Sequence, residues 1–231
     1  MATIYANTQD GYVARLNQST WSNARANSSG TTGSSTGVAF YQGISGIKAS
    51  SRGGGSVYTI YRSFMAFDVS GISANVDSAN VDSATLKIYG FNQSSGDLIA
   101  VKATSDIQIL GTADFEAIEG WDSSGTDGSG GGDMESSVTK YSDEISTWST
   151  SGYNDIALNA QALADMRDDS YLYIALLNFD YDLKDVTPTN STGRNGLYYA
   201  NYTGTSRDPY IDYDLAAVAT ADNAIFFGTN F

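Results

Sequence analysis

The residues in this sequence that could do chemistry are carboxylates and hydroxyls, because histidine and cysteine are both absent. Histidine is the usual general base near neutral pH, and histidine and cysteine are the main zinc ligands. Zinc chemistry, disulfides and Ser-His-Asp triads are therefore excluded. The 26 Asp and Glu residues leave two kinds of site to consider. One is a carboxylate pair that hydrolyses a glycosidic bond, and the other is a calcium site with oxygen ligands.

No pair of carboxylates is singled out by the sequence as catalytic. Asp165, Asp168 and Asp169 lie around the end of an expected helix, where solvated side chains are the simpler interpretation. We therefore predict that the protein is not an enzyme.

One acidic loop, DSSGTDGSGGGD at 122–133, resembles a calcium-binding loop in composition. An EF-hand loop that began at Asp122 would need glycine at its sixth position, but Asp127 stands there. A flexible acidic loop is the favoured interpretation, with a metal site as the alternative.

The overall charge restricts the partners. The net charge is −14, and the 12 Lys and Arg residues are scattered singly. Proteins that bind nucleic acid cluster such residues against phosphates, so neither nucleic acid nor an anionic membrane surface is an expected partner. The first residues lack the basic and apolar regions of a signal peptide, and no apolar run spans a bilayer. We expect synthesis in a cytoplasm.

The fold class follows from the composition and from one central stretch. Charged residues make up 16%, against about 25% in a typical domain, and residues that favour strands and turns replace them. Residues 62–69 alternate in the period-2 pattern of a half-buried strand, and 85–89 resume it. We predict one two-layer antiparallel β-sandwich, a jelly roll, over residues 1–214, with one short helix near 160–168. Its expected core contains Met65, Phe67, Leu86, Ile88, Leu172, Ile174 and Leu176.

The other elements are placed by turn and cap signals. Asp10-Gly11 suggests a strand pair within 3–16, and Asn195-Gly196 suggests a second hairpin. Asn159 is the expected cap of the helix, and Asp208-Pro209 opens the last strand. A polar loop is expected at 17–37, where Trp21 either anchors the loop over the core or binds a ligand at the surface. Further strands are expected at 38–49, 99–104, 106–110 and 171–179.

The last residues, 215–231, differ in composition from the sandwich. Apolar side chains are concentrated at Ile225, Phe226, Phe227 and Phe231. Exposing each large apolar side chain to water costs roughly 1.5–3 kcal/mol. This tail therefore either folds back onto its own sandwich or docks into a neighbouring subunit, and we predict the second.

The order of motifs resembles the DNRLRE-type jelly-roll domain, a relative of carbohydrate-binding modules. The similarity covers roughly residues 8–214. It rests on the matching motifs Asp10-Gly11-Tyr12-Val13, Arg62-Ser63-Phe64, Phe67-Asp68-Val69-Ser70, Ser83-Ala84-Thr85-Leu86, Asp155-Ile156-Ala157-Leu158 and Pro209-Tyr210-Ile211. The long first loop and the acidic loop at 122–133 depart from the family pattern. The resemblance implies a two-sheet sandwich without implying an activity. It also implies a structural calcium near the chain ends, for which Asp10 and Asp212 are the matching positions.

Two functional hypotheses follow. The first is a bacteriophage virion structural protein, a head-decoration protein or a tail or fibre component, located in the virion and partnered by other virion proteins or by its own copies. The second is a carbohydrate-binding module or adhesin for cell-surface glycan, since aromatic residues stack on sugar rings and the chain has 16 tyrosines and 3 tryptophans. Aromatic residues also fill sandwich cores, so their number alone does not separate the two.

Overall fold

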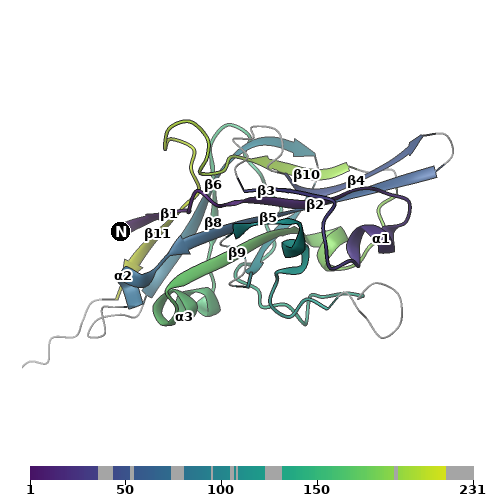
Figure 1. Cartoon of the computed structure of the whole chain (residues 1–231). Helices are drawn as coiled ribbons and strands as arrows, with labels where there is room; N and C mark the ends of the chain where they lie inside the picture. Colours follow the sequence, from purple (N-terminus) through teal and green to yellow (C-terminus); the bar gives the residue numbers. More distant parts are fainter. Residues whose placement is uncertain are drawn as a thin grey trace, which may run out of the picture.

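The structure, a computed structural model, describes residues 1–35, 44–52, 55–73, 81–94, 96–104, 107, 109–122, 132–189 and 192–216. Their strands form two antiparallel sheets, which confirms the all-β sandwich (Figure 1). None of the helices within these ranges is long and apolar enough to cross a membrane.

The smaller sheet has the strand order β1-β11-β6-β8. These strands are β1 (Ala2–Tyr5), β11 (Tyr210–Leu215), β6 (Val81–Ser94) and β8 (Tyr153–Ala157). We call it the small sheet. Strand β6 is long enough to leave it, and its far end, beyond Gly90, pairs with β10 (Thr192–Leu197).

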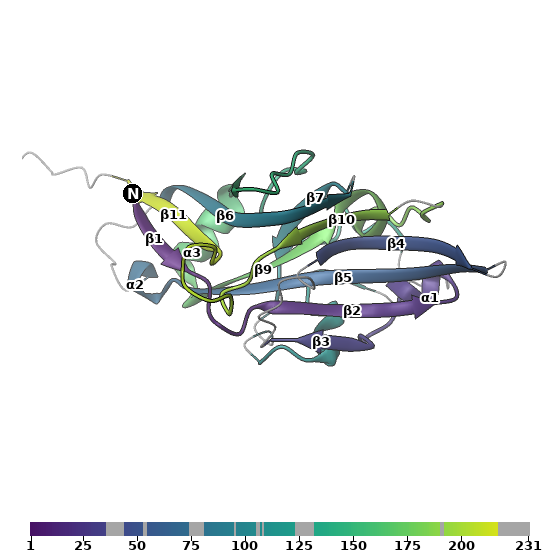
Figure 2. The same cartoon turned by 90° about the horizontal axis from the view of Figure 1, so that it is seen from above.

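The larger sheet is built around β5 (Gly55–Asp68), as Figure 2 shows. One edge of β5 pairs with β2 (Gly11–Gln18), which pairs in turn with β3 (Thr32–Ser34). The other edge pairs first with β4 (Ile44–Arg52) and then with β9 (Tyr171–Asn178). Strand β10 lies beyond β4, and β7 (Leu98–Lys102) lies beyond β9. We call it the large sheet.

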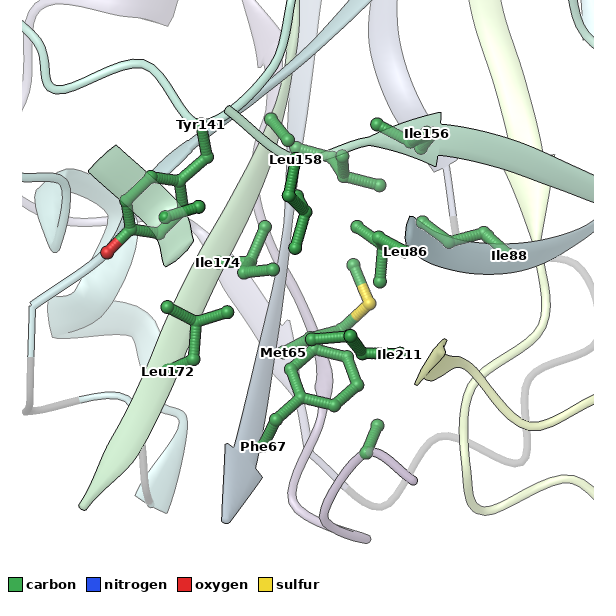
Figure 3. Packing of buried hydrophobic residues seen from close by; sticks show 14 of the residues in the cluster. Met65, Phe67, Leu86, Ile88, Tyr141, Ile156, Leu158, Leu172, Ile174 and Ile211 are labelled. Carbon is green, nitrogen blue, oxygen red and sulfur yellow. The ribbon is translucent and has the colours of Figure 1, made fainter. Parts of the chain in front are cut away.

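The space between the sheets is filled by the side chains that the alternation predicted. All seven expected core residues are buried. Figure 3 shows Met65, Phe67 and Leu172 of the large sheet facing the small sheet's Leu86 and Ile211. The period-2 pattern therefore identified the inner face of both sheets correctly.

The other face of β5 is buried as well, so the expectation of a half-buried strand was wrong. Ile60 and Phe64 point away from the small sheet into a second apolar cluster. Helix α1 (Trp21–Arg25), the 3₁₀ turn η2 (Thr112–Glu116) and the π-helical turn η3 (Phe179–Leu183) cover this face.

Several expected elements differ from those observed. The region 17–37 contains α1 and β3 instead of being a plain loop, and Trp21 is buried in it as an anchor. Within 106–110, the described residues form no strand. Besides α3 (Ala160–Asp168), which Asn159 caps as expected, the short helices α1 and α2 (Ser70–Ser73) are present.

The two predicted hairpins are both absent. β1 pairs with β11 and β2 with β5, because the intervening residues cross from one sheet to the other: Ala6 and Asn7 donate backbone hydrogen bonds to Pro209 and Ala66. Asn195 and Gly196 lie inside β10, where the Asn195 amide is buried and donates to the Gly96 carbonyl. A buried hydrogen bond replaces the turn that the dipeptide suggested.

A buried ionic cluster lies inside the second apolar cluster. Arg62 of β5 donates two hydrogen bonds of 2.8 Å to the Asp182 carboxylate and one of 2.6 Å to the Phe115 carbonyl. Arg25 of α1 donates to the backbone carbonyl of Asp182 at 2.6 Å. The Arg62 guanidinium also lies 4.0 Å from the ring centroid of Trp121. Both arginines and Asp182 are at most 1% exposed, so this cluster is structural.

Replacing Asp182 with Asn should cost about 3–5 kcal/mol of folding free energy, because two buried guanidiniums would lose their carboxylate. Chemical denaturation measures this loss. Asp180→Asn is the matched control on the same turn: Asp180 lies beside Asp97 and Glu144, so losing its charge should leave stability unchanged or slightly higher. Equal losses in the two variants would contradict the assignment.

Candidate functional site: an aromatic surface on the small sheet

The outer face of the small sheet carries a row of aromatic side chains. Leu86, Ile88, Ile156 and Ile211 point into the core, so their neighbours along each strand point outward. The outward set, together with two tyrosines that follow β10, is Tyr5, Tyr89, Phe91, Tyr153, Tyr198, Tyr202 and Tyr210. We call these seven residues the tyrosine face.

The rings of the tyrosine face form a continuous series across all four strands of the small sheet. Tyr5 on β1 lies 5.6 Å from Tyr210 on β11, measured between ring centroids. Tyr210 lies 4.9 Å from Tyr153 on β8, and Tyr153 lies 5.3 Å from Tyr89 on β6. Tyr198 continues the series at 5.5 Å from Tyr89. Most of these contacts are edge-to-face, the arrangement that aromatic quadrupoles favour.

One arginine holds the end of the series together. The Arg207 guanidinium carbon lies 4.7 Å from the centroid of Tyr198 and 5.1 Å from those of Tyr89 and Tyr202. Arg207 also donates a hydrogen bond of 3.3 Å to the Tyr202 hydroxyl. These cation–π contacts tie the loop after β10 to the strands, so the rings are preorganised.

Charged and polar groups lie among the rings. Lys87 forms a 2.6 Å ion pair with Asp155, and Thr3 donates a 2.7 Å hydrogen bond to Asp212. Burial, followed by the charge of Tyr210, raises the pKa of Tyr153 to about 12, so its hydroxyl stays protonated and donates a 3.2 Å hydrogen bond to the Asp208 carbonyl. Rigid, partly exposed rings with hydroxyl donors suit the flat apolar face of a sugar or an aromatic residue of another protein.

Of the two residues proposed for calcium, Asp10 is buried and Asp212 lies on the outer side of β11 with the tyrosine face. Asp10 accepts one hydrogen bond, from the Ala200 amide at 2.9 Å, and its second carboxylate oxygen has no partner. The acid whose charge acts on Asp10 is Asp208, which is also buried with one unpartnered oxygen. Among the described residues, Asp10 and Asp208 thus fit a divalent cation better than Asp10 and Asp212.

Burial, only partly offset by the Ala200 amide, raises the pKa of Asp10 to about 8. The unfolded carboxyl loses its proton near pH 4, while the folded one keeps it to about pH 8. With no cation bound, the free energy of unfolding should therefore fall as pH rises between these values, by about 1.4 kcal/mol for each unit of pKa difference. Asp10→Asn should remove most of this fall, which thermal melts across pH would measure. Asp212→Asn is the control, and an unchanged slope in Asp10→Asn would refute the assignment.

Three further acids lie close together although no pattern in the sequence predicted it, because they come from distant segments. The carboxylates of Asp97, Glu144 and Asp180 lie within 4.8 Å of one another. Desolvation and the hydrogen bond and charge of Asp97 raise the pKa of Glu144. Asp165, expected to be solvated, is instead buried and accepts a hydrogen bond from Tyr141. The prediction was wrong for Asp165, because that side of α3 packs against Tyr141 and Lys102. It is confirmed for Asp168 and Asp169, which are exposed at the end of the helix.

Two predicted regions lie outside the described residues. They are the tail with Ile225, Phe226, Phe227 and Phe231, and most of the acidic loop at 122–133. The sequence did not predict the tyrosine face, because the number of tyrosines does not show which of them share one face of a sheet. Tyr89 and Phe91, two residues apart and outside the predicted core set, were the available signal.

No protein-family model matches the sequence, and the search of curated proteins finds no relative.

Proposed function

We propose that this chain is a bacteriophage virion structural protein, a head-decoration protein or a tail or fibre component that acts through its surfaces. Its partners are then other virion proteins or its own copies, and its location is the virion. Neither nucleic acid nor a membrane is a partner in this proposal. The tyrosine face is the observation that supports this role best. Seven packed aromatic residues on one sheet form a surface of the kind that is enriched at protein interfaces. The resemblance to jelly-roll domains and the apolar residues at 225–231 point the same way.

Deleting residues 216–231 should leave a folded, soluble sandwich that no longer assembles, because its aromatic anchors are gone. Sedimentation and incorporation into particles would measure the loss. The double variant Phe226→Ser and Phe227→Ser keeps the length of the chain and should behave like the deletion. Undiminished occupancy of the truncated protein in the particle or oligomer would refute the docking role.

The second candidate is a carbohydrate-binding module or adhesin, and the same tyrosine face favours it, since sugar rings stack on partly exposed tyrosines. Tyr210→Ala should reduce retention on insoluble polysaccharides about tenfold, because a ring stacking contact and its apolar area are lost. Tyr210→Phe, which keeps the ring, is the matched control. Equal retention of the wild type and both variants would remove the tyrosine face as the sugar site.

We further propose that Asp10 and Asp208 hold a structural calcium ion, as the family resemblance implied for Asp10. Calcium takes oxygen ligands, and each of these buried carboxylates has one oxygen without a partner. Removing calcium with a chelator should then lower the melting temperature, while Asp208→Asn should abolish this difference. An identical melting temperature with and without chelator would rule out the bound calcium ion. The buried carboxyl of Asp10 would in that case be protonated below pH 8.

A further inference from the structure

A cavity of about 420 Å³ lies where β7 ends beside the start of β9. Its walls include Lys102, Thr104, Glu119, Asp169, Tyr171 and Tyr173. None of them belongs to the tyrosine face. The volume is in the range of small-molecule sites, about 300–1,000 Å³.

Lys102 and the carboxylates of Glu119 and Asp169 form the polar wall, and a third carboxylate, that of Asp165, lies behind the lysine. The Lys102 ammonium nitrogen lies 3.0 Å from Asp165, 3.5 Å from Glu119 and 3.9 Å from Asp169. Asp165 is fixed from behind by the Tyr141 hydroxyl at 2.5 Å. Glu119 and Asp169 are 49% and 50% exposed, so their carboxylates remain accessible.

Lys102 stays a hydrogen-bond donor. Burial alone would lower its pKa, but the hydrogen bond to Asp165 and the charges of the neighbouring carboxylates outweigh burial and raise the pKa. The ammonium is therefore protonated at any physiological pH.

Two tyrosines form the apolar wall. The rings of Tyr171 and Tyr173 lie nearly parallel, at 18° and 5.8 Å between centroids. They come from alternate positions on β9, so the sheet fixes their spacing. Aromatic rings beside a polar wall select a ligand with one apolar face and one hydroxylated edge.

The charges narrow the ligand class further. Three carboxylates around one ammonium repel an anion. A small cation would have to displace Lys102, which already occupies the point where the carboxylates converge. A neutral ligand that both donates and accepts hydrogen bonds fits without displacing any group.

We propose that this cavity binds one pyranose ring of a neutral saccharide. Sugar hydroxyls donate to Glu119 and Asp169 and accept from Lys102, and the C–H face of the ring packs on Tyr171. This inference rests on the carbohydrate-binding candidate above and adds to it a second sugar site, in a cavity separate from the tyrosine face.

Saturation-transfer NMR and calorimetric titration with glucose, galactose, mannose, N-acetylglucosamine and their disaccharides test the proposal on the full chain. Tyr171→Ala should weaken binding of the best sugar about tenfold, and Tyr171→Phe should preserve it. Asp169→Asn should weaken binding several-fold because a charged acceptor is lost. Asp168→Asn is the matched control, since Asp168 is exposed, pairs with Arg167 and does not line the cavity. If Tyr171→Ala fails to fold, Glu119→Gln and Asp169→Asn carry the test.

The outcomes separate this inference from the function on which it rests. Sugar binding that is lost in the cavity variants and kept in Asp168→Asn supports it. Sugar binding that survives the cavity variants but is lost in Tyr210→Ala overturns the cavity site and leaves the carbohydrate-binding role intact. No binding of any sugar overturns both.

Discussion

The contact of Arg62 with Asp182 determines how α1, η2 and η3 are positioned on the large sheet. These three elements, which cover its outer face, are the covering segments. One carboxylate holds the Arg62 guanidinium of β5 through both of its oxygens, and the backbone of the same residue accepts from Arg25 of α1. The π-helical turn, α1 and η2 therefore meet at one point. Buried ion pairs add little net stability compared with an apolar packing, but they are costly to break. Here the pair joins β5 directly to η3, and the same two residues connect to α1 through Arg25 and to η2 through the Phe115 carbonyl.

This arrangement decides which face of the sandwich remains uncovered. Because the covering segments bury the second face of the large sheet, the outer face of the small sheet is the broad sheet face that they leave uncovered. Its outward positions carry tyrosines among the charged residues that are usual on a solvated sheet. The cavity beside Lys102 arises at the other boundary, where β7 ends and the covering segments begin.

The sequence allowed the inner faces of β5, β6 and β9 and the cap of α3 to be predicted, because these depend on local periodicity and local hydrogen bonds. Pairing between distant strands was not predictable in this way. Asp10-Gly11 and Asn195-Gly196 have the composition of turns, yet neither forms a hairpin. The chain turns before Asp10, whose amide donates to the Asn7 carbonyl, and a tertiary hydrogen bond holds Asn195 inside β10. Arg62 lies in a motif that was recognised, but its buried carboxylate partner is 120 residues away. The tyrosine face likewise exists only after four strands have been assembled.

Strand β6 has 14 residues and belongs to both sheets. Its first part pairs with β11 and β8, and its last part pairs with β10, which continues into the large sheet through β4. The two layers are therefore linked by an unbroken backbone as well as by the apolar contacts between them. A shearing load applied to one layer passes to the other along β6, where many hydrogen bonds must break together. The two layers can therefore separate only if β6 loses its hydrogen bonds to one of them.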